Sequence, residues 1–316
     1  MLQALVPTIN LIVSTPFVLY PTLFIFGTIF GSFFKVVVDR SAKIYEQEQE
    51  PLSLKDKICE QINLFCKKYL LRQKKQSSES WHQGRSRCDH CGQQLAWYDN
   101  IPLLSYMWLG GKCRFCRGKI GLSYPLTELL TGCVFIFSAF VVLEKGFVSF
   151  LSVLPALLFS LLFLSILWLI FLFDWKYLII PDSLVLALVG LVIIKLAVSL
   201  ISKRYELVWI DLLIALSLFA AFLLLRYLPL LMVKKEGMGW GDVKLIAPLG
   251  FLLGYQRSLI GVFCAFIIGG VWGIILLVSR KAKVGQMVSF GPLLVLGAFI
   301  ALGWGQELWQ LYWSLL

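Results

Sequence analysis

The chain has 316 residues, of which 59% are hydrophobic and 15% charged, and its mean hydropathy is +0.82. Soluble globular domains carry about 25% charged and about 45–50% apolar residues, so this composition excludes a soluble globular fold and makes the bilayer the main solvent. Of the 29 Lys and Arg residues, 15 lie in residues 39–122, between apolar blocks. This placement is typical of the cytoplasmic side of a membrane protein in contact with anionic membrane lipid, and it argues against a nucleic-acid partner.

The apolar segments predict an all-α polytopic membrane protein with about eight transmembrane helices, because a spanning helix needs about 20 mainly apolar residues. The first 34 residues carry no charge. They therefore lack the basic start of a signal peptide, and the first segment is expected to remain as a helix. Residues 243–253 are short for a span. The expected segments are 17–38, 124–143, 147–173, 183–202, 207–228, 243–253, 259–279 and 288–308.

We expect three regions: a first transmembrane helix (1–38), a small cytoplasmic insertion between helices one and two (39–122), and a multi-helix membrane domain (123–316). With the basic insertion inside, alternation places the connections 174–182, 234–242 and 280–283 in the cytoplasm. Lys203 and Arg204 then fall outside, against the usual charge bias. Within the insertion, apolar residues recur every three or four positions from Leu54 to Tyr69 among lysines, which predicts an amphipathic helix on the membrane surface.

Two charged residues lie within the apolar segments of the second half. Lys195 and Asp211 are at similar distances from the turn near Arg204. Charges inside a membrane usually pair or serve a function. We expect these two side chains to pair across a helical hairpin.

The insertion contains two CxxC pairs, separated by 21 residues. Four thiolates from two such pairs close a tetrahedral zinc site and leave no open position for catalysis, so the prediction is a structural zinc-ribbon-like domain. Disulfides are the alternative, but a reducing cytoplasm disfavours them. His90 could replace a cysteine as ligand, but we expect it to point outward. The expected ligands are Cys88, Cys91, Cys113 and Cys116.

Three aspartates lie at the predicted inner edge of the membrane. Asp182 follows Pro181 just before an apolar run, which predicts an N-terminal helix cap. Asp174 ends an apolar helix, where the dipole disfavours a carboxylate by about 0.3–1 kcal/mol, so its presence suggests a function. Asp242 could be a cap, but Gly239 and Gly241 precede it, and glycine allows a second backbone to come close.

Asp174 and Asp242 are therefore candidates for a catalytic pair. Two carboxyl groups that share a site cannot both ionise cheaply, so one keeps its proton while the other activates a water molecule. Such a pair cleaves a peptide bond without a metal or a nucleophilic side chain. The spacing alone leaves a proton-relay transporter equally open. Gly239 and Gly241 would let an extended substrate approach the site.

The order of the motifs along the chain resembles one family. It begins with Gly31–Phe33 and the CxxC pairs, with Asn100–Ser105 and Gly111–Cys113 between them, and continues with Tyr124–Pro125 and Glu128. It ends with Asp174, Pro181–Asp182, Gly239–Lys244 and Phe290–Pro292. On these residues the chain resembles the type IV prepilin leader peptidases, which are bifunctional aspartic peptidases of the bacterial inner membrane.

The resemblance implies an activity and its residues. The catalytic pair of the family maps onto Asp174 and Asp242. The implied substrates are type IV prepilins and the pseudopilins of type II secretion, whose basic leader ends in glycine and is cut at the cytoplasmic face. The resemblance also implies N-methylation of the new N-terminus with S-adenosylmethionine, an activity linked to the cytoplasmic insertion. Glu128 is the one candidate residue for the methyl-donor site.

One stretch departs from the family pattern. After Gly31–Phe33 the family has a neutral amide and then an aromatic residue where this chain has Lys35 and Asp39. These changes leave the peptidase motifs intact and bear on methylation and substrate preference. One alternative is a peptidase of archaeal preflagellins, which the CxxC pairs oppose. The other is a membrane transporter or assembly adaptor with a structural zinc domain.

Overall fold

The computed structural model describes residues 16–49, 86–88, 90–144, 150–203, 205–233, 238–279 and 289–315. Most of these residues are helical, and the described part of the chain contains only two isolated β-bridges in place of a sheet. The all-α prediction is confirmed. The predicted amphipathic helix from Leu54 to Tyr69 lies outside the described residues.

Seven described helices are long and apolar enough to cross a membrane. The remaining predicted segment, residues 243–253, forms α10 (Trp240–Leu253), which has 14 residues. At about 1.5 Å per residue α10 is about 21 Å long, shorter than the roughly 30 Å hydrocarbon core. The seven are α2 (Pro16–Gln49), α6 (Ser123–Glu144), α7 (Phe150–Tyr177), α8 (Asp182–Ile201), α9 (Tyr205–Val233), α11 (Tyr255–Val278) and α12 (Gly291–Leu315).

The contacts divide the chain into two compact units, one formed by residues 24–133 and the other by residues 1–23 with 134–316. The predicted domain boundary after Val38 falls inside α2, because that helix continues to Gln49. The first unit holds most of α2, the first half of α6, and a lobe with the short helices η1 (Trp97–Asn100) and α5 (Leu104–Trp108). The second unit holds α7 to α12.

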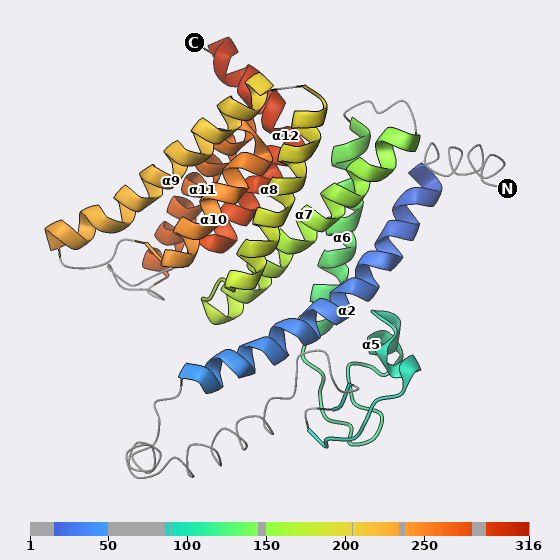
Figure 1. Cartoon of the computed structure of the whole chain (residues 1–316). Helices are drawn as coiled ribbons and strands as arrows, with labels where there is room; N and C mark the ends of the chain where they lie inside the picture. Colours follow the sequence, from blue (N-terminus) through green and yellow to red (C-terminus); the bar gives the residue numbers. More distant parts are fainter. Residues whose placement is uncertain are drawn as a thin grey trace, which may run out of the picture. The chain divides into compact units, whose positions relative to one another are not determined.

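In the second unit, α10 is the central helix. It packs on α8, α9, α11 and α12, and Figure 1 shows it beside α8, α9 and α11. Ten of its residues are buried, including Asp242. Small residues bring the backbones close: a Cβ added to Gly250 would lie 3.4 Å from the Cα of Ala215 in α9. Lipid tails are as apolar as side chains, so close packing of this kind holds helices together inside a membrane.

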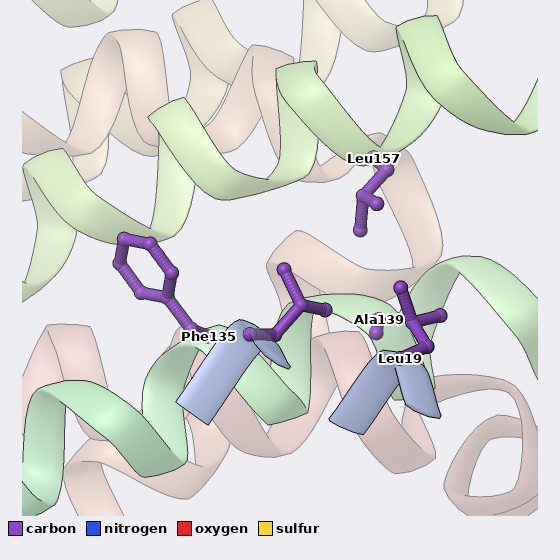
Figure 2. Close-up of a cluster of buried hydrophobic side chains, with 5 residues drawn as sticks. Leu19, Phe135, Ala139 and Leu157 are labelled. Atoms are coloured by element: carbon purple, nitrogen blue, oxygen red, sulfur yellow. The ribbon is translucent and has the colours of Figure 1, made fainter. Parts of the chain in front are cut away.

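A separate apolar cluster in the same unit joins the beginning of α2 to the second half of α6 and to α7. Figure 2 shows these side chains converging between the three helices. Ala139 is fully buried there, and its small side chain lets the larger side chains around it pack closely over α6. The buried members are Leu19, Leu23, Phe135, Ala139 and Leu157.

In the first unit, two glycines bring α2 and α6 together. A Cβ added to Gly31 would lie 2.8 Å from the Cα of Glu128, and one added to Gly132 would lie 2.6 Å from the ring of Phe24. Side chains at either position would push the helices apart. The close packing of α2 on α6 therefore explains why the Gly31–Phe33 motif begins with a glycine.

Candidate active site and metal site

Asp174 lies in the last turn of α7 and is only 3% exposed. Its helix ends three residues later, where Leu178 adopts a positive φ of 57°. The hydroxyl of Ser289 donates a hydrogen bond to Oδ2 of Asp174, and the backbone N–H of Gly291 donates another to the same carboxyl group. The acid at this unfavourable helix end therefore receives two donors from the start of α12.

Asp242 lies in the first turn of α10 and is 6% exposed. The positive end of the α10 dipole favours a carboxylate there. The N-cap residue of α10 is Gly239, which has no side chain to cap the helix. Asp242 instead accepts a hydrogen bond from the backbone N–H of Phe290. A Cβ at Gly239 would lie 3.3 Å from Oδ2 of Asp242, so the glycine leaves room for that carboxyl group.

One short segment therefore contacts both acids. Ser289 and Gly291 donate to Asp174, while Phe290 between them donates to Asp242. The two carboxyl groups are close enough to interact electrostatically. A Cβ on Gly291 would overlap the carboxylate of Asp174. The sequence analysis did not identify Ser289 as a site residue. Its position directly before the Phe290–Pro292 motif was the only indication, because no contact was predicted for that motif.

Gly241 has a neighbour from its own chain. A Cβ at this position would lie 3.1 Å from Cβ of Ile180, in the connection between α7 and α8. The glycine therefore lets this connection pack against the first turn of α10, next to Asp242. Gly239 is exposed. No contact of the described residues tests the predicted approach of a substrate to either glycine.

The capping prediction for Asp182 is wrong. The N-cap residue of α8 is Pro181, without a side-chain cap, and Asp182 is the first residue of the helix. Its carboxylate accepts a bond of 2.9 Å from Nζ of Lys244 in α10. Sequence spacing could not reveal a partner 62 residues away.

The predicted pairing of Lys195 with Asp211 is confirmed. Nζ of Lys195 in α8 lies 2.9 Å from Oδ2 of Asp211 in α9. Both groups also reach the junction between α10 and α11, which the sequence did not indicate. Lys195 donates to the carbonyl of Phe251 at 2.6 Å, and Asp211 accepts from the N–H of Tyr255 at 3.1 Å.

The four predicted zinc ligands come together in the lobe of the first unit. The sulfurs of Cys88, Cys91, Cys113 and Cys116 all lie within 4.8 Å of one another. Sulfurs about 2.3 Å from a tetrahedral zinc ion stand about 3.8 Å apart. The sulfurs of Cys88 and Cys116 are 3.8 Å apart, as that geometry requires. The donor set fits a closed four-thiolate metal site.

The two CxxC turns have the same backbone design. The N–H of Gly92 donates to the carbonyl of Cys88 at 2.8 Å, and the N–H of Arg117 donates to the carbonyl of Cys113 at 3.0 Å. Gly92 and Arg117 both adopt positive φ. Each turn is closed by an isolated β-bridge, Arg87 with Gln94 and Lys112 with Lys119.

The surroundings of the sulfurs act differently on Cys113 and Cys116. Backbone N–H groups of Cys116 and Phe115 hydrogen-bond the Cys113 thiol and lower its pKa to about 7, which favours the thiolate that binds metals. The Gly118 N–H lowers the pKa of the Cys116 thiol, but burial and the neighbouring thiols outweigh it and raise this pKa to about 11. His90 is not among the clustered ligands. Its Nε2 lies 3.2 Å from the carbonyl of Lys119, so it connects the first turn to the second.

Glu128 is buried in α6 and holds the lobe to the helices of its unit. Its Oε2 accepts the N–H of Leu103 at 2.8 Å, and the hydroxyl of Ser32 in α2 also donates to it. Leu103 adopts a positive φ of 60° immediately before α5. These contacts give Glu128 a positioning role.

Lys35 and Asp39, the two departures from the family pattern, pair with each other. Nζ of Lys35 lies 2.9 Å from Oδ2 of Asp39, one turn further along α2, and 5.1 Å from the centre of the Tyr124 ring. The charge of Lys35 is thus balanced within the helix that introduces it.

Comparison with known proteins gives matches along most of the chain. Residues 25–142 match the Bacterial Peptidase A24 N-terminal domain, and residues 161–274 match the Type IV leader peptidase family. No solved structure gives a significant match.

Curated relatives agree with these matches. Proteins named Prepilin leader peptidase/N-methyltransferase include one from Pseudomonas aeruginosa, 32% identical over 97% of both chains. Another, from Neisseria gonorrhoeae, is 30% identical over 95% of this chain and 96% of its own. A third, from Stutzerimonas stutzeri, is 34% identical over 72% of this chain and 74% of its own. This multi-pass membrane protein therefore belongs to the type IV leader peptidase family.

Proposed function

We propose that this protein removes the basic leader from type IV prepilins and type II secretion pseudopilins and then N-methylates the new N-terminus. The observation that carries the proposal is the pair Asp174 and Asp242, buried together and contacted by one segment, Ser289–Gly291. The relatives that match nearly the whole chain are named for the same two activities.

The donors around the pair favour different roles for its two acids. Asp174 receives the Ser289 hydroxyl and the Gly291 N–H, whereas Asp242 receives the Phe290 N–H. One additional hydrogen bond to a charged group contributes about 1.5–3 kcal/mol. The opposing dipole contributions, about 0.3–1 kcal/mol at each helix end and so about 0.6–2 kcal/mol together, are on average smaller. Asp174 is therefore the ionised member and Asp242 the protonated one.

The reaction follows from these roles. Asp174 takes a proton from a water molecule whose oxygen attacks the scissile carbonyl carbon, while Asp242 donates a hydrogen bond to the carbonyl oxygen. When the tetrahedral adduct collapses, the C–N bond breaks and the leaving amine takes the proton that Asp174 received from the water, which returns Asp174 to its ionised state. The products are a leader that ends in a carboxylate and a protein with a free amino group.

We place the reaction at the cytoplasmic face of the bacterial inner membrane. Asp174 and Asp242 lie at the same ends of the bundle as the connections 174–182 and 234–242, which the basic-loop rule assigns to the cytoplasm. A basic leader and acidic side chains attract each other. Membrane lipid is the other partner, and nucleic acid is not.

The four cysteines would hold a structural Zn²⁺ ion, which would contribute folding free energy to the lobe. With Cys88, Cys91, Cys113 and Cys116 all clustered, no open position remains for a substrate. S-adenosylmethionine would supply the methyl group. Glu128 supports methylation by holding Leu103 and the start of α5 in place.

The test combines the detergent-solubilised protein with a prepilin from the same genome and S-adenosylmethionine, and product mass is the readout. Asp174→Asn and Asp242→Asn are expected to lose cleavage by at least about 1,000-fold, since each removes a group that must exchange a proton. Glu307→Gln, the same chemical change at an exposed position of α12, is expected to cleave normally.

Each outcome decides a part of the proposal. A leaderless, methylated product from the wild type alone supports both activities. A leaderless product without the methyl group supports the peptidase activity alone. The departures from the family pattern at Lys35 and Asp39 would then be linked to the loss of methylation. An intact prepilin with folded wild-type protein would refute the peptidase and favour the transporter or adaptor.

A further inference from the structure

The helix that carries Asp242 ends at a corner made by two charged side chains from other helices. α10 stops at Leu253, and α11 begins at Tyr255. Between them Gly254 has a φ of +80°, a conformation that favours glycine. A Cβ there would lie 3.3 Å from Oδ1 of Asp211.

Each charge lies at a helix end whose dipole has the opposite sign. Nζ of Lys195 lies 2.6 Å from the carbonyl of Phe251 and 3.4 Å from that of Leu252, in the last turn of α10. Oδ1 of Asp211 accepts the N–H of Tyr255, the first residue of α11. A cation at a helix C-terminus and an anion at an N-terminus both complement the dipole. Without water in the bilayer, these free backbone groups need such partners.

The free backbone groups need hydrogen-bond partners, but these partners need not be a buried ion pair. Charges inside a membrane are costly, and apolar residues of similar volume are often as stable as a buried ion pair or more so. The pair does, however, fix where α10 ends along the direction of its axis. Lys195 belongs to α8 and Asp211 to α9, two of the four helices against which α10 packs.

The other end of α10 is tied to α8 as well. Lys244 pairs with Asp182, the first residue of α8, at 2.9 Å. Asp242 lies two residues before Lys244 and nine before Phe251, about 14 Å along the helix from the corner. Although α10 contains Pro248, it is short and packs on four neighbouring helices, so a displacement of one end is passed on to the other. A shift of the corner would therefore move Asp242 relative to Asp174.

We propose that Lys195 and Asp211 are positioning residues that hold α10 where Asp242 meets Asp174. The assignment rests on the proposed peptidase function. Neither side chain contacts the catalytic pair in the described contacts; both act through the backbone of α10 and α11.

The test is the double variant Lys195→Met with Asp211→Leu, which removes both charges and retains apolar volume. Cleavage of a prepilin is measured over a range of substrate concentrations, with the melting temperature of each variant in the same detergent. We expect kcat to fall by at least about 10-fold with KM within about twofold, because displacement of a reacting group by about 1 Å can cost about 100-fold. The melting temperature should fall, because the variant leaves the carbonyl of Phe251 and the N–H of Tyr255 without these partners, so kcat is measured well below it.

The control is Glu206→Leu, which removes an exposed charge from the first turn of α9, the helix that carries Asp211. It should leave kcat for cleavage unchanged. Lys195→Arg retains donors for the carbonyls and should keep most of the activity. The exchanged pair, Lys195→Asp with Asp211→Lys, keeps an ion pair but reverses both charges against the helix ends, so it should remain impaired.

Three results would overturn the assignment. The first is wild-type kcat in the apolar double variant. The second is a loss of kcat that follows the fraction of unfolded protein and disappears on cooling, which means a purely structural role. The third is full activity of the exchanged pair, which decides the matter even if the apolar variant does not fold. Failure of the wild type to cleave in the same assay refutes the proposed function instead.

Discussion

Ser289, Phe290 and Gly291 determine the surroundings of both acids, although none of them carries a charge. Their donors come from a segment that lies 115 residues beyond Asp174 in the chain. The two acids could be identified from their places at helix ends. Which groups hydrogen-bond to them could not, because that depends on where α12 begins in space.

Replacement of Ser289 by Ala should lower kcat for prepilin cleavage by about 10-fold or more, since a hydrogen bond to a charged group contributes about 1.5–3 kcal/mol. Ser289→Thr keeps the hydroxyl and should retain most of the rate. Ser138→Ala is the matched control, because it removes a buried serine hydroxyl bonded to Ser160 at 3.0 Å. Equal rates for Ser289→Ala and Ser138→Ala would contradict the role of Ser289.

Gly291→Ala should reduce cleavage by about 100-fold, because the added Cβ overlaps the Asp174 carboxylate and displaces it. Gly190→Ala is its control. A Cβ at Gly190 meets no atom within 4 Å, and alanine is favoured over glycine within a helix by about 0.5–1 kcal/mol. Steady-state rates and melting temperatures of both variants check the prediction, and a fully active Gly291→Ala protein would refute it.

Among the helices, α11 and α12 make the most extensive contact. It depends on two glycines: a Cβ on Gly297 would overlap the carbonyl oxygen of Gly261. The apolar runs predicted both helices, because about 20 apolar residues in a membrane leave few alternatives to a helix. They did not predict which faces meet, since lipid-facing and buried positions are equally apolar.

Gly297→Ala is expected to destabilise the protein by about 1–3 kcal/mol, as overpacking usually does, and to lower the midpoint of thermal unfolding in detergent. Because α12 follows the Ser289–Gly291 segment, cleavage should fall as well. Gly273→Ala in α11, where a Cβ meets nothing within 4 Å, should be neutral or slightly stabilising. A midpoint for Gly297→Ala no lower than that of Gly273→Ala would show that the helices can adjust.

At the scale of the whole molecule, the acids and the cysteines belong to different units. Asp174 and Asp242 lie in the unit of residues 1–23 and 134–316, and the CxxC pairs lie in that of residues 24–133. The lobe around the cysteines has little secondary structure beyond η1, α5 and two bridges. Such a small domain is expected to depend on its metal for stability.

Removal of zinc with a chelator should therefore speed amide hydrogen exchange in residues 86–121 and abolish methylation, while the helices α8 to α12 stay protected and cleavage continues. Cys113→Ser should lower the zinc content of the purified protein, and Cys264→Ser, in α11 outside the cluster, should not. Acid should release the ion, because protons and zinc compete for the same thiolates. Equal loss of both activities on chelation would contradict the independence of the two units.

The sequence by itself determined the membrane class, the helical segments, the two acids and the four cysteines. These follow from local rules: the length of apolar runs, the place of a charge at a helix end, and the spacing of ligands. Asp182 shows the limit of such rules, since it looked like a cap and pairs with Lys244 of another helix. Only the tertiary structure decided the partners of Asp174 and Asp242, the corner at Gly254, and the central place of α10 among its neighbours. Each of these depends on which helix faces meet, and inside a membrane close packing decides that, without a polar and an apolar face to mark it in the sequence.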